Sequence, residues 1–165
     1  MKKSLLILMI TGFLTIGLSE VQAQTNQPNL NQTELIKQFI GSWKFDSGKD
    51  TTGFSEFKPF GTGLEGYWKI VTKGKIVTEG KQLGGYDKKI DKFVYVNLEK
   101  GKDIEILALW FISTTKYITT NYSDIANLEK ASFKVEGEFK SPNLQTQTTI
   151  INGKPLNPDT YTRIK

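Results

Sequence analysis

The stretch "FKVEGEF", from Phe133 to Phe139, decides the class of fold, because apolar and charged residues alternate along it with a period of two. Phe133, Val135 and Phe139 fall on one face, and Lys or Glu occupies most positions between them. Successive side chains of a β-strand point to opposite faces of the sheet. The stretch therefore predicts a strand with one buried face and one solvated face.

The same period of two recurs on both sides of this stretch. "LEGYWKIVT", residues 64–72, places Leu64, Trp68 and Ile70 on one face. "DIEILALWFI", residues 103–112, is apolar on both faces, which predicts a strand buried on both sides, with an N-terminal helix over its outer face. The predicted strands are 42–47, 53–59, 63–72, 75–83, 91–98, 103–112, 115–122, 130–140, 144–151 and 159–165.

Short turn motifs separate these strands and define how they connect. The motifs are Lys73-Gly74-Lys75, Gly84-Gly85-Tyr86-Asp87, Lys100-Gly101-Lys102-Asp103 and Asn152-Gly153. Short turns describe an antiparallel meander, and a long meander either splits into a sandwich or closes into a barrel without edges. We expect the closed form, an all-β, single antiparallel up-and-down β-barrel of about eight to ten strands. The charged outer faces disfavour an outer-membrane barrel, whose outer band faces lipid.

The residues before the strands predict one short helix. "NQTELIKQFI", residues 31–40, has Leu35, Ile36 and Phe39 at helical spacing. Thr33 is a plausible N-cap, and the helix is expected to end at Gly41.

The N-terminus has the order of regions that is typical of a secretory signal peptide. Two lysines precede an apolar run, and a polar stretch ends at Ala23. We expect residues 1–23 to be a cleaved signal, the alternative being a membrane anchor, residues 24–32 to be a flexible leader, and residues 33–165 to be one barrel domain. The predicted location is the periplasm or the medium, since no Cys near Ala23 offers a site for a lipid anchor.

Composition excludes several kinds of chemistry. The chain contains no Cys and no His, which removes disulfides, thiolate nucleophiles and the commonest metal and haem ligand. We therefore expect no cofactor and no metal. The net charge of +5 comes mostly from scattered Lys, which disfavours a nucleic-acid surface. The acidic residues at turns, including Asp103 and Glu105, are expected to face water, so an enzyme is the less favoured hypothesis.

Three motifs carry a resemblance to a known family. Gly41-x-Trp43 follows the predicted helix, "LGGYD" occupies residues 83–87, and the chain ends in "YTRIK". Together they resemble the calycin superfamily, and in particular the exported bacterial lipocalin-like domains of unknown function. The resemblance implies that Trp43 closes one end of the barrel and that Arg163, the only Arg in the chain, packs across its ring.

Aromatic and polar side chains on inward faces are candidates for lining a cavity. They are Trp68, Tyr95, Trp110, Tyr117, Asn121, Phe133 and Phe139. For each of them taken singly, a place in a filled core is the stronger reading, because the interior of a small barrel can be packed with side chains. The sequence favours an exported protein that binds a small apolar or amphipathic molecule. A filled structural or protein-interaction barrel and an enzyme on the same barrel are the alternatives, and the oligomeric state stays open.

Overall fold

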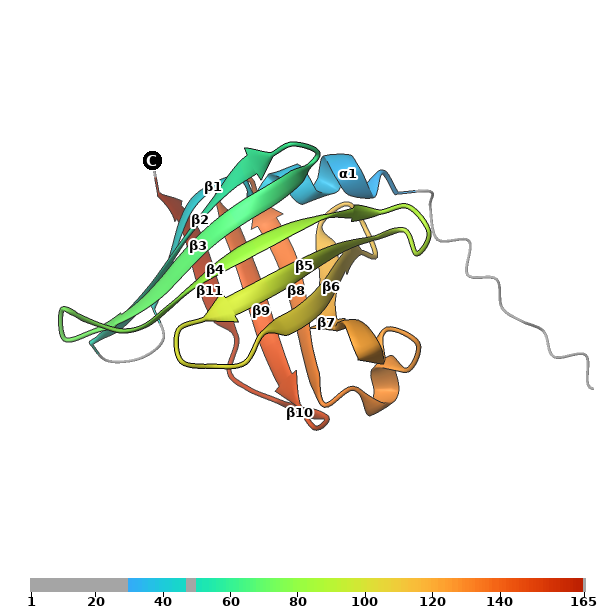
Figure 1. Ribbon diagram of the computed structural model, residues 1–165. Coiled ribbons are helices and arrows are strands. Elements are labelled where there is room, and N and C mark those ends of the chain that lie inside the picture. Colours follow the sequence, from blue (N-terminus) through green and yellow to red (C-terminus); the bar gives the residue numbers. More distant parts are fainter. Residues whose placement is uncertain (1–29, 47–49, 165) are drawn as a thin grey trace, which may run out of the picture.

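The computed structural model describes residues 30–46 and 50–164, so the predicted signal peptide and most of the predicted leader lie outside the described residues. Figure 1 shows a twisted antiparallel barrel with α1 across one end. The strands are β1 (Gly41–Asp46), β2 (Thr51–Phe60), β3 (Gly63–Thr72), β4 (Lys75–Asp87), β5 (Lys92–Glu99), β6 (Glu105–Phe111), β7 (Lys116–Asn121), β8 (Phe133–Ser141), β9 (Leu144–Ile151), β10 (Lys154–Pro155) and β11 (Asp159–Ile164). The helical elements are α1 (Gln32–Leu35) and the 3-10 helices η1 (Ile36–Phe39), η2 (Tyr122–Asp124) and η3 (Leu128–Lys130).

The predicted closed barrel is confirmed. Strands β1 to β8 form the meander, β8 pairs with β9, β9 pairs with β11, and β11 pairs with β1. The short strand β10 pairs with β9 outside this ring of ten strands. Because the two ends of the described chain meet through β1 and β11, the sheet has no long open edge.

Two of the predicted turns have the backbone geometry of tight hairpins. Lys73 and Gly74 have φ angles of 49° and 76°, and Asn152 and Gly153 have φ angles of 47° and 75°. Two consecutive residues with positive φ form the turn whose twist matches paired strands.

The turn predicted at residues 84–87 is wrong. Strand β4 continues through this segment to Asp87, paired with β5, and the reversal follows at residues 88–91. A Cβ atom on Gly84 would collide with the backbone carbonyl of Val94 and with Tyr95. The glycine at this position therefore permits close approach of two strands, which is the other common role of Gly within a sheet.

The predicted helix is present but shorter and differently capped. Four α-helical residues lead into one 3-10 turn, and the N-cap is Asn31, whose side chain accepts from the Glu34 amide at 3.2 Å, rather than Thr33. The end of the predicted flexible leader is ordered, because Gln32 is buried and holds Phe111 of β6. The Gln32 amide donates to the Phe111 carbonyl at 3.0 Å and accepts from the Phe111 N–H at 2.8 Å.

The helix plugs an end of the barrel. The prediction that it covers the outer face of β6 is wrong. Ile36 and Phe39 belong to the buried core cluster inside the barrel. The outer face of β6 is nonetheless buried at Ala108 and Trp110, and η2 packs against this strand. Burial on both sides of β6 was therefore predicted correctly, but the N-terminal helix was wrongly expected to provide it.

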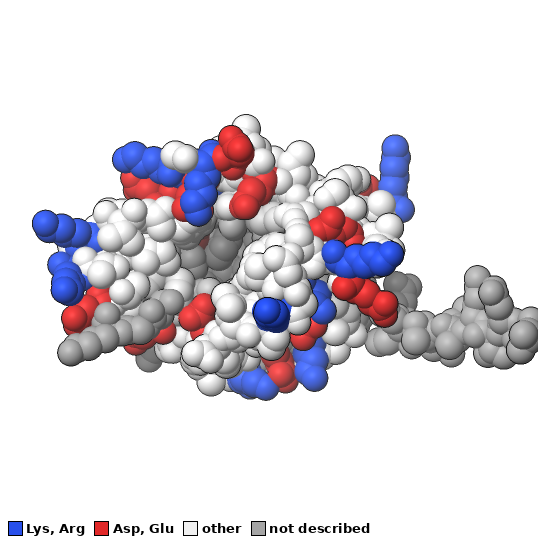
Figure 2. All heavy atoms as spheres, turned by 90° about the horizontal axis from the view of Figure 1, so that it is seen from below, with Lys and Arg blue, Asp and Glu red and all other residues white. Residues whose placement is uncertain are grey.

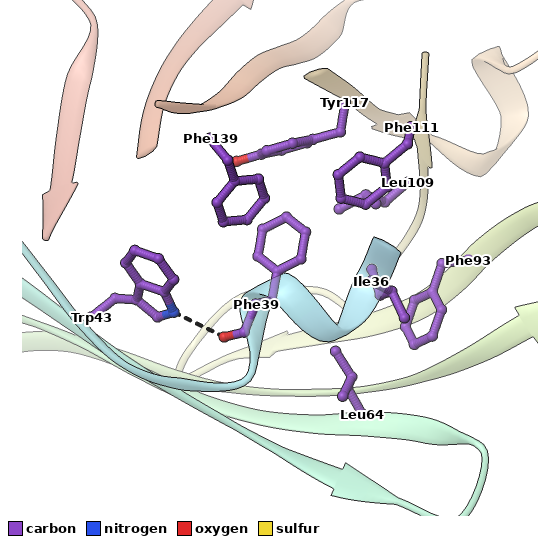
Figure 3. Close-up of a cluster of buried hydrophobic side chains, with 9 residues drawn as sticks. All are labelled: Ile36, Phe39, Trp43, Leu64, Phe93, Leu109, Phe111, Tyr117 and Phe139. Carbon is purple, nitrogen blue, oxygen red and sulfur yellow. Dashed lines mark hydrogen bonds between the residues drawn. The ribbon is translucent and has the colours of Figure 1, made fainter. Parts of the chain in front are cut away.

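Aromatic rings fill the closed end of the barrel, as Figure 3 shows. Phe39 of η1 lies at the centre, with ring centroids 4.9 Å from Tyr117 and 5.1 Å from Phe139. The Trp43 indole is fully buried and donates to the Phe39 carbonyl at 2.8 Å. Edge-to-face contacts of Phe39 fix the helix against strands β7 and β8, and the indole hydrogen bond fixes it against β1.

Arg163 of β11 lies across Trp43, as the resemblance implies. Its guanidinium carbon is 4.2 Å from the centroid of the Trp43 ring. The guanidinium also donates to the carbonyls of Gln38 (2.9 Å), Pro142 (2.9 Å) and Ile40. One planar cation thereby joins the helix, the first strand and the turn before β9.

Candidate functional site

A cavity of about 360 Å³ lies inside the barrel, above the aromatic layer of the closed end. Ile36, Phe39 and Leu64 form its floor, and residues of all ten ring strands and of η1 line it. Seen from below, the molecule is hollowed near its centre, so the interior opens at a face away from α1 (Figure 2). The volume falls in the range of sites that hold small molecules, roughly 300–1,000 Å³.

The wall of the cavity is mainly apolar and aromatic. Its aromatic members are Phe39, Phe45, Phe57, Trp68, Phe93, Tyr95, Tyr117, Phe133 and Tyr161. Leu107 and Leu109 of β6, and Val135 of β8, supply aliphatic surface. A surface of this kind gains free energy when an apolar molecule replaces water on it.

A polar network lies on one side of the cavity and is built around Asn97 of β5. The buried Asn97 side chain accepts from the Trp68 indole and from the Gln82 amide, both at 3.1 Å. Its own amide donates to a carboxylate oxygen of Glu105 at 2.8 Å. Because three neighbours fix Asn97, the network holds both the indole and the carboxylate in set orientations.

A second polar group lies on the side of β7 and β9. The Tyr117 hydroxyl donates to the side-chain Oε1 of Gln145 at 2.7 Å, and the side-chain amide of Gln147 donates to the same oxygen at 3.4 Å. Burial raises the pKa of Tyr117 and of Tyr95 well above the usual value. Both phenols are therefore neutral at physiological pH and offer hydrogen bonds, not charge.

Four of the seven predicted ligand-binding residues line the cavity, namely Trp68, Tyr95, Tyr117 and Phe133. Phe139 faces inward but lies in the aromatic layer at the closed end, against Trp43, where it is 4% exposed. Asn121 lies at the end of β7, and its amide donates to Asp124 at 3.3 Å and to Ser132 at 3.5 Å. Phe139 and Asn121 are therefore not part of the cavity lining.

The prediction that Trp110 lines the cavity is wrong. Leu107, Leu109 and Phe111 lie on the inward face of β6 together with Glu105, so Trp110 points to the outer face. There the Lys92 ammonium lies 4.1 Å from the centroid of its ring. The sequence could not resolve the two faces because both are apolar in this strand, and only pairing with β5 and β7 sets them.

Glu105 is the functional candidate that the sequence analysis missed. Its position beside a turn predicted a carboxylate that faces water, and the side chain is exposed, but it also lines the cavity at its rim. A signal was present in the facing strand: Phe93, Tyr95 and Asn97 share one face, so the polar residue interrupts an inward stripe. Cross-strand pairing then places Glu105 directly opposite Asn97.

The described lining of the cavity carries charge of one sign. Among the described residues that line it, Glu105 is the single formally charged side chain, and neither Lys nor Arg contributes to this wall. Asp159 faces the same side of the sheet as two lining residues, because it precedes Tyr161 by two positions and pairs with Gln147. Burial raises the pKa of Asp159.

The fold and the site together define a closed antiparallel β-barrel with an internal, mostly apolar cavity. The chain matches none of the models of known protein families and none of the curated proteins with which it was compared. Within residues 30–46 and 50–164, no helix combines the length and the hydropathy that crossing a membrane requires.

Proposed function

We propose that this protein is an exported binding protein that holds a small apolar or amphipathic molecule in the barrel cavity. The observation that carries the proposal is the cavity itself, which is open at one end, walled by aromatic rings and provided with fixed polar groups. Cavities with these properties are the usual sites of small-molecule binding.

The interior geometry favours binding over a purely structural barrel. A filled barrel needs no opening, and its buried polar groups are costly unless they serve a purpose. Here the network around Asn97 faces a cavity of about 360 Å³. We include membership of the calycin superfamily in the proposal on the strength of Gly41, Trp43 and Arg163, and export on the strength of the N-terminal pattern.

The first experiment is native mass spectrometry of the full-length chain after mild purification from its producing cells. We expect an adduct of a few hundred daltons that is lost on denaturation. The second is titration with N-phenylnaphthylamine, a neutral dye that becomes fluorescent in apolar sites. We expect saturable binding and a rise in Tm with dye concentration, since a ligand of the native state stabilises it.

Two tryptophans offer a matched pair of variants for the dye titration. Trp68→Ala removes part of the wall of the cavity and is expected to weaken dye binding several-fold, whereas Trp110→Ala alters only the outer face.

A second pair of variants adds a ring instead of removing one. Ser55→Phe places the ring in the cavity and should reduce the fraction of protein molecules that bind the dye, whereas Lys44→Phe adds the same ring on the exposed side of β1. Equal affinities for all four folded variants and the wild type would refute binding in this cavity.

A further inference from the structure

We propose that the ligand is an amphipathic cation, an organic amine whose apolar part fills the cavity and whose ammonium group lies at the rim against Glu105. This inference rests on the proposed binding function and adds the chemical class of the ligand. It is carried by the placement of fixed carboxylate and aromatic groups around an apolar cavity whose described lining has no basic side chain.

The Glu105 carboxylate is oriented before any ligand arrives. One of its oxygens accepts from the Asn97 amide at 2.8 Å, and Asn97 is held in turn by Trp68 and Gln82. The ion pairs found among the described residues do not involve Glu105. The neighbouring Lys102 forms its ion pair with Glu99, whose hydrogen bond raises the pKa of Lys102 most, and the charge of Glu105 contributes least to that rise. The second oxygen of Glu105 can therefore accept a charge-assisted hydrogen bond from an ammonium group.

A second carboxylate adds to the negative potential of the same interior. Asp159 shares its face with Tyr161 and Gln147, both of which line the cavity. Burial, and after it the charge of Asp159, raises the pKa of Tyr161. The ion pairs of the described chain leave out Asp159 as well. Two carboxylates within low-dielectric walls attract a cation and repel an anion.

The single arginine of the chain, Arg163, is already committed elsewhere. Arg163 lies beneath the floor, across Trp43, and its donors are used by the carbonyls of Gln38, Ile40 and Pro142. A ligand carboxylate would find no such partner at the described wall of the cavity. Trp68 and Tyr95, by contrast, line the cavity, and aromatic rings of this kind attract cations.

The test compares three ligands that share one apolar chain and differ in the head group: octylamine, octanol and octanoate. Each displaces N-phenylnaphthylamine from the full-length protein at pH 7. We expect octylamine to bind about tenfold more tightly than octanol, as a charge-assisted hydrogen bond implies, and octanoate to bind more weakly than octanol. Glu105→Gln keeps the acceptor for Asn97 and should remove most of the amine preference without changing the affinity for octanol.

Two further variants make the result specific to this position. Glu136→Gln removes the same charge from an exposed site on the outer face of β8 and should leave all three affinities unchanged. Glu105→Lys should shift the preference towards octanoate. If octanol binds but octylamine has no advantage, or if Glu105→Gln retains that advantage, the inference is wrong while the proposed function stands. If no octyl compound or dye binds the folded protein, the proposed function fails and the inference with it.

Discussion

At the scale of single residues, Gly41 is the position where the closed end of the barrel tolerates no side chain. Its φ angle is 119°, and a Cβ atom there would lie 2.5 Å from a guanidinium nitrogen of Arg163. Gly41 and Trp43 of the first strand thus form a contact with Arg163 of the last strand that closes the barrel. The same geometry explains why Gly, one spacer and Trp stand where the helix ends.

Gly41→Ala is therefore expected to destabilise the protein by about 1–3 kcal/mol, because the residue is strained and Arg163 must move. Urea unfolding followed by tryptophan fluorescence measures the change. Gly85→Ala is the matched control: a Cβ atom at Gly85 meets nothing within 4 Å, and its effect should stay within about 0.5 kcal/mol. Equal effects of the two substitutions would contradict the proposed role of the contact between Gly41 and Arg163.

Arg163 offers a second test of the same contact. We expect Arg163→Lys to lower the free energy of unfolding by about 1–3 kcal/mol, nearly as much as Arg163→Ala. A lysine keeps the charge, but it cannot stack a flat group on Trp43 while donating to three carbonyls. Lys154→Ala, at an exposed position of β10, is the control for loss of charge. Wild-type stability in Arg163→Lys would remove this role.

At the scale of elements, the helix is held by a side chain that acts as a strand partner. Phe111 is the last residue of β6 and extends beyond its pairing with β5, so its backbone N–H and C=O lack a partner on that side. The Gln32 amide supplies both hydrogen bonds. The element that plugs the barrel is thereby fixed to the strand that it closes.

Gln32→Ala leaves these two buried backbone groups unpaired and is expected to cost about 2 kcal/mol. Amide hydrogen exchange at Phe111 should accelerate well beyond the exchange of other β6 amides, since the helix detaches locally before the barrel unfolds. Thr33→Ala, one residue away and exposed, changes neither hydrogen bond and serves as the control. Unchanged protection at Phe111 would show that the helix is held by Phe39 and Ile36 alone.

At the scale of the whole molecule, the interior carries charge that reduces the stability of the empty barrel. Burial raises the pKa of Asp159, which means that the native state binds its proton more tightly than the unfolded chain does. The contribution to stability is full at acid pH and is lost as pH rises from the unfolded pKa through the raised native one. A cationic ligand would offset this cost at neutral pH.

Asp159→Asn is accordingly expected to stabilise the ligand-free protein at pH 7 and to have no such effect at pH 3. The gain should stay below about 1 kcal/mol, because the half-buried carboxylate is partly screened by solvent. The difference in Tm between variant and wild type, measured across this range, cancels the titration of all other groups. A gain that is equal at both pH values would rule out removal of charge as its cause.

The strands of the barrel were largely predictable, and the reason is local. Alternation in "FKVEGEF" and the paired turn residues Asn152 and Gly153 are properties of short segments, and the structure has the strand and the turn there. Segments with conflicting local signals were misread. The glycines of residues 84–87 resemble a turn, but they serve close strand approach, which depends on Tyr95 and Val94 of the next strand.

The sequence by itself therefore determined an antiparallel β meander preceded by a short helix, since periodicity and turn chemistry act within a few residues. The contact of Trp43 with Arg163 was implied by the resemblance to the calycin superfamily. Only the tertiary structure decided which face of β6 turns inward, why Trp110 is outside, and how Asn97 holds Glu105 at the rim. These features depend on strand register and on barrel closure, which join residues far apart in the chain and which no local pattern encodes.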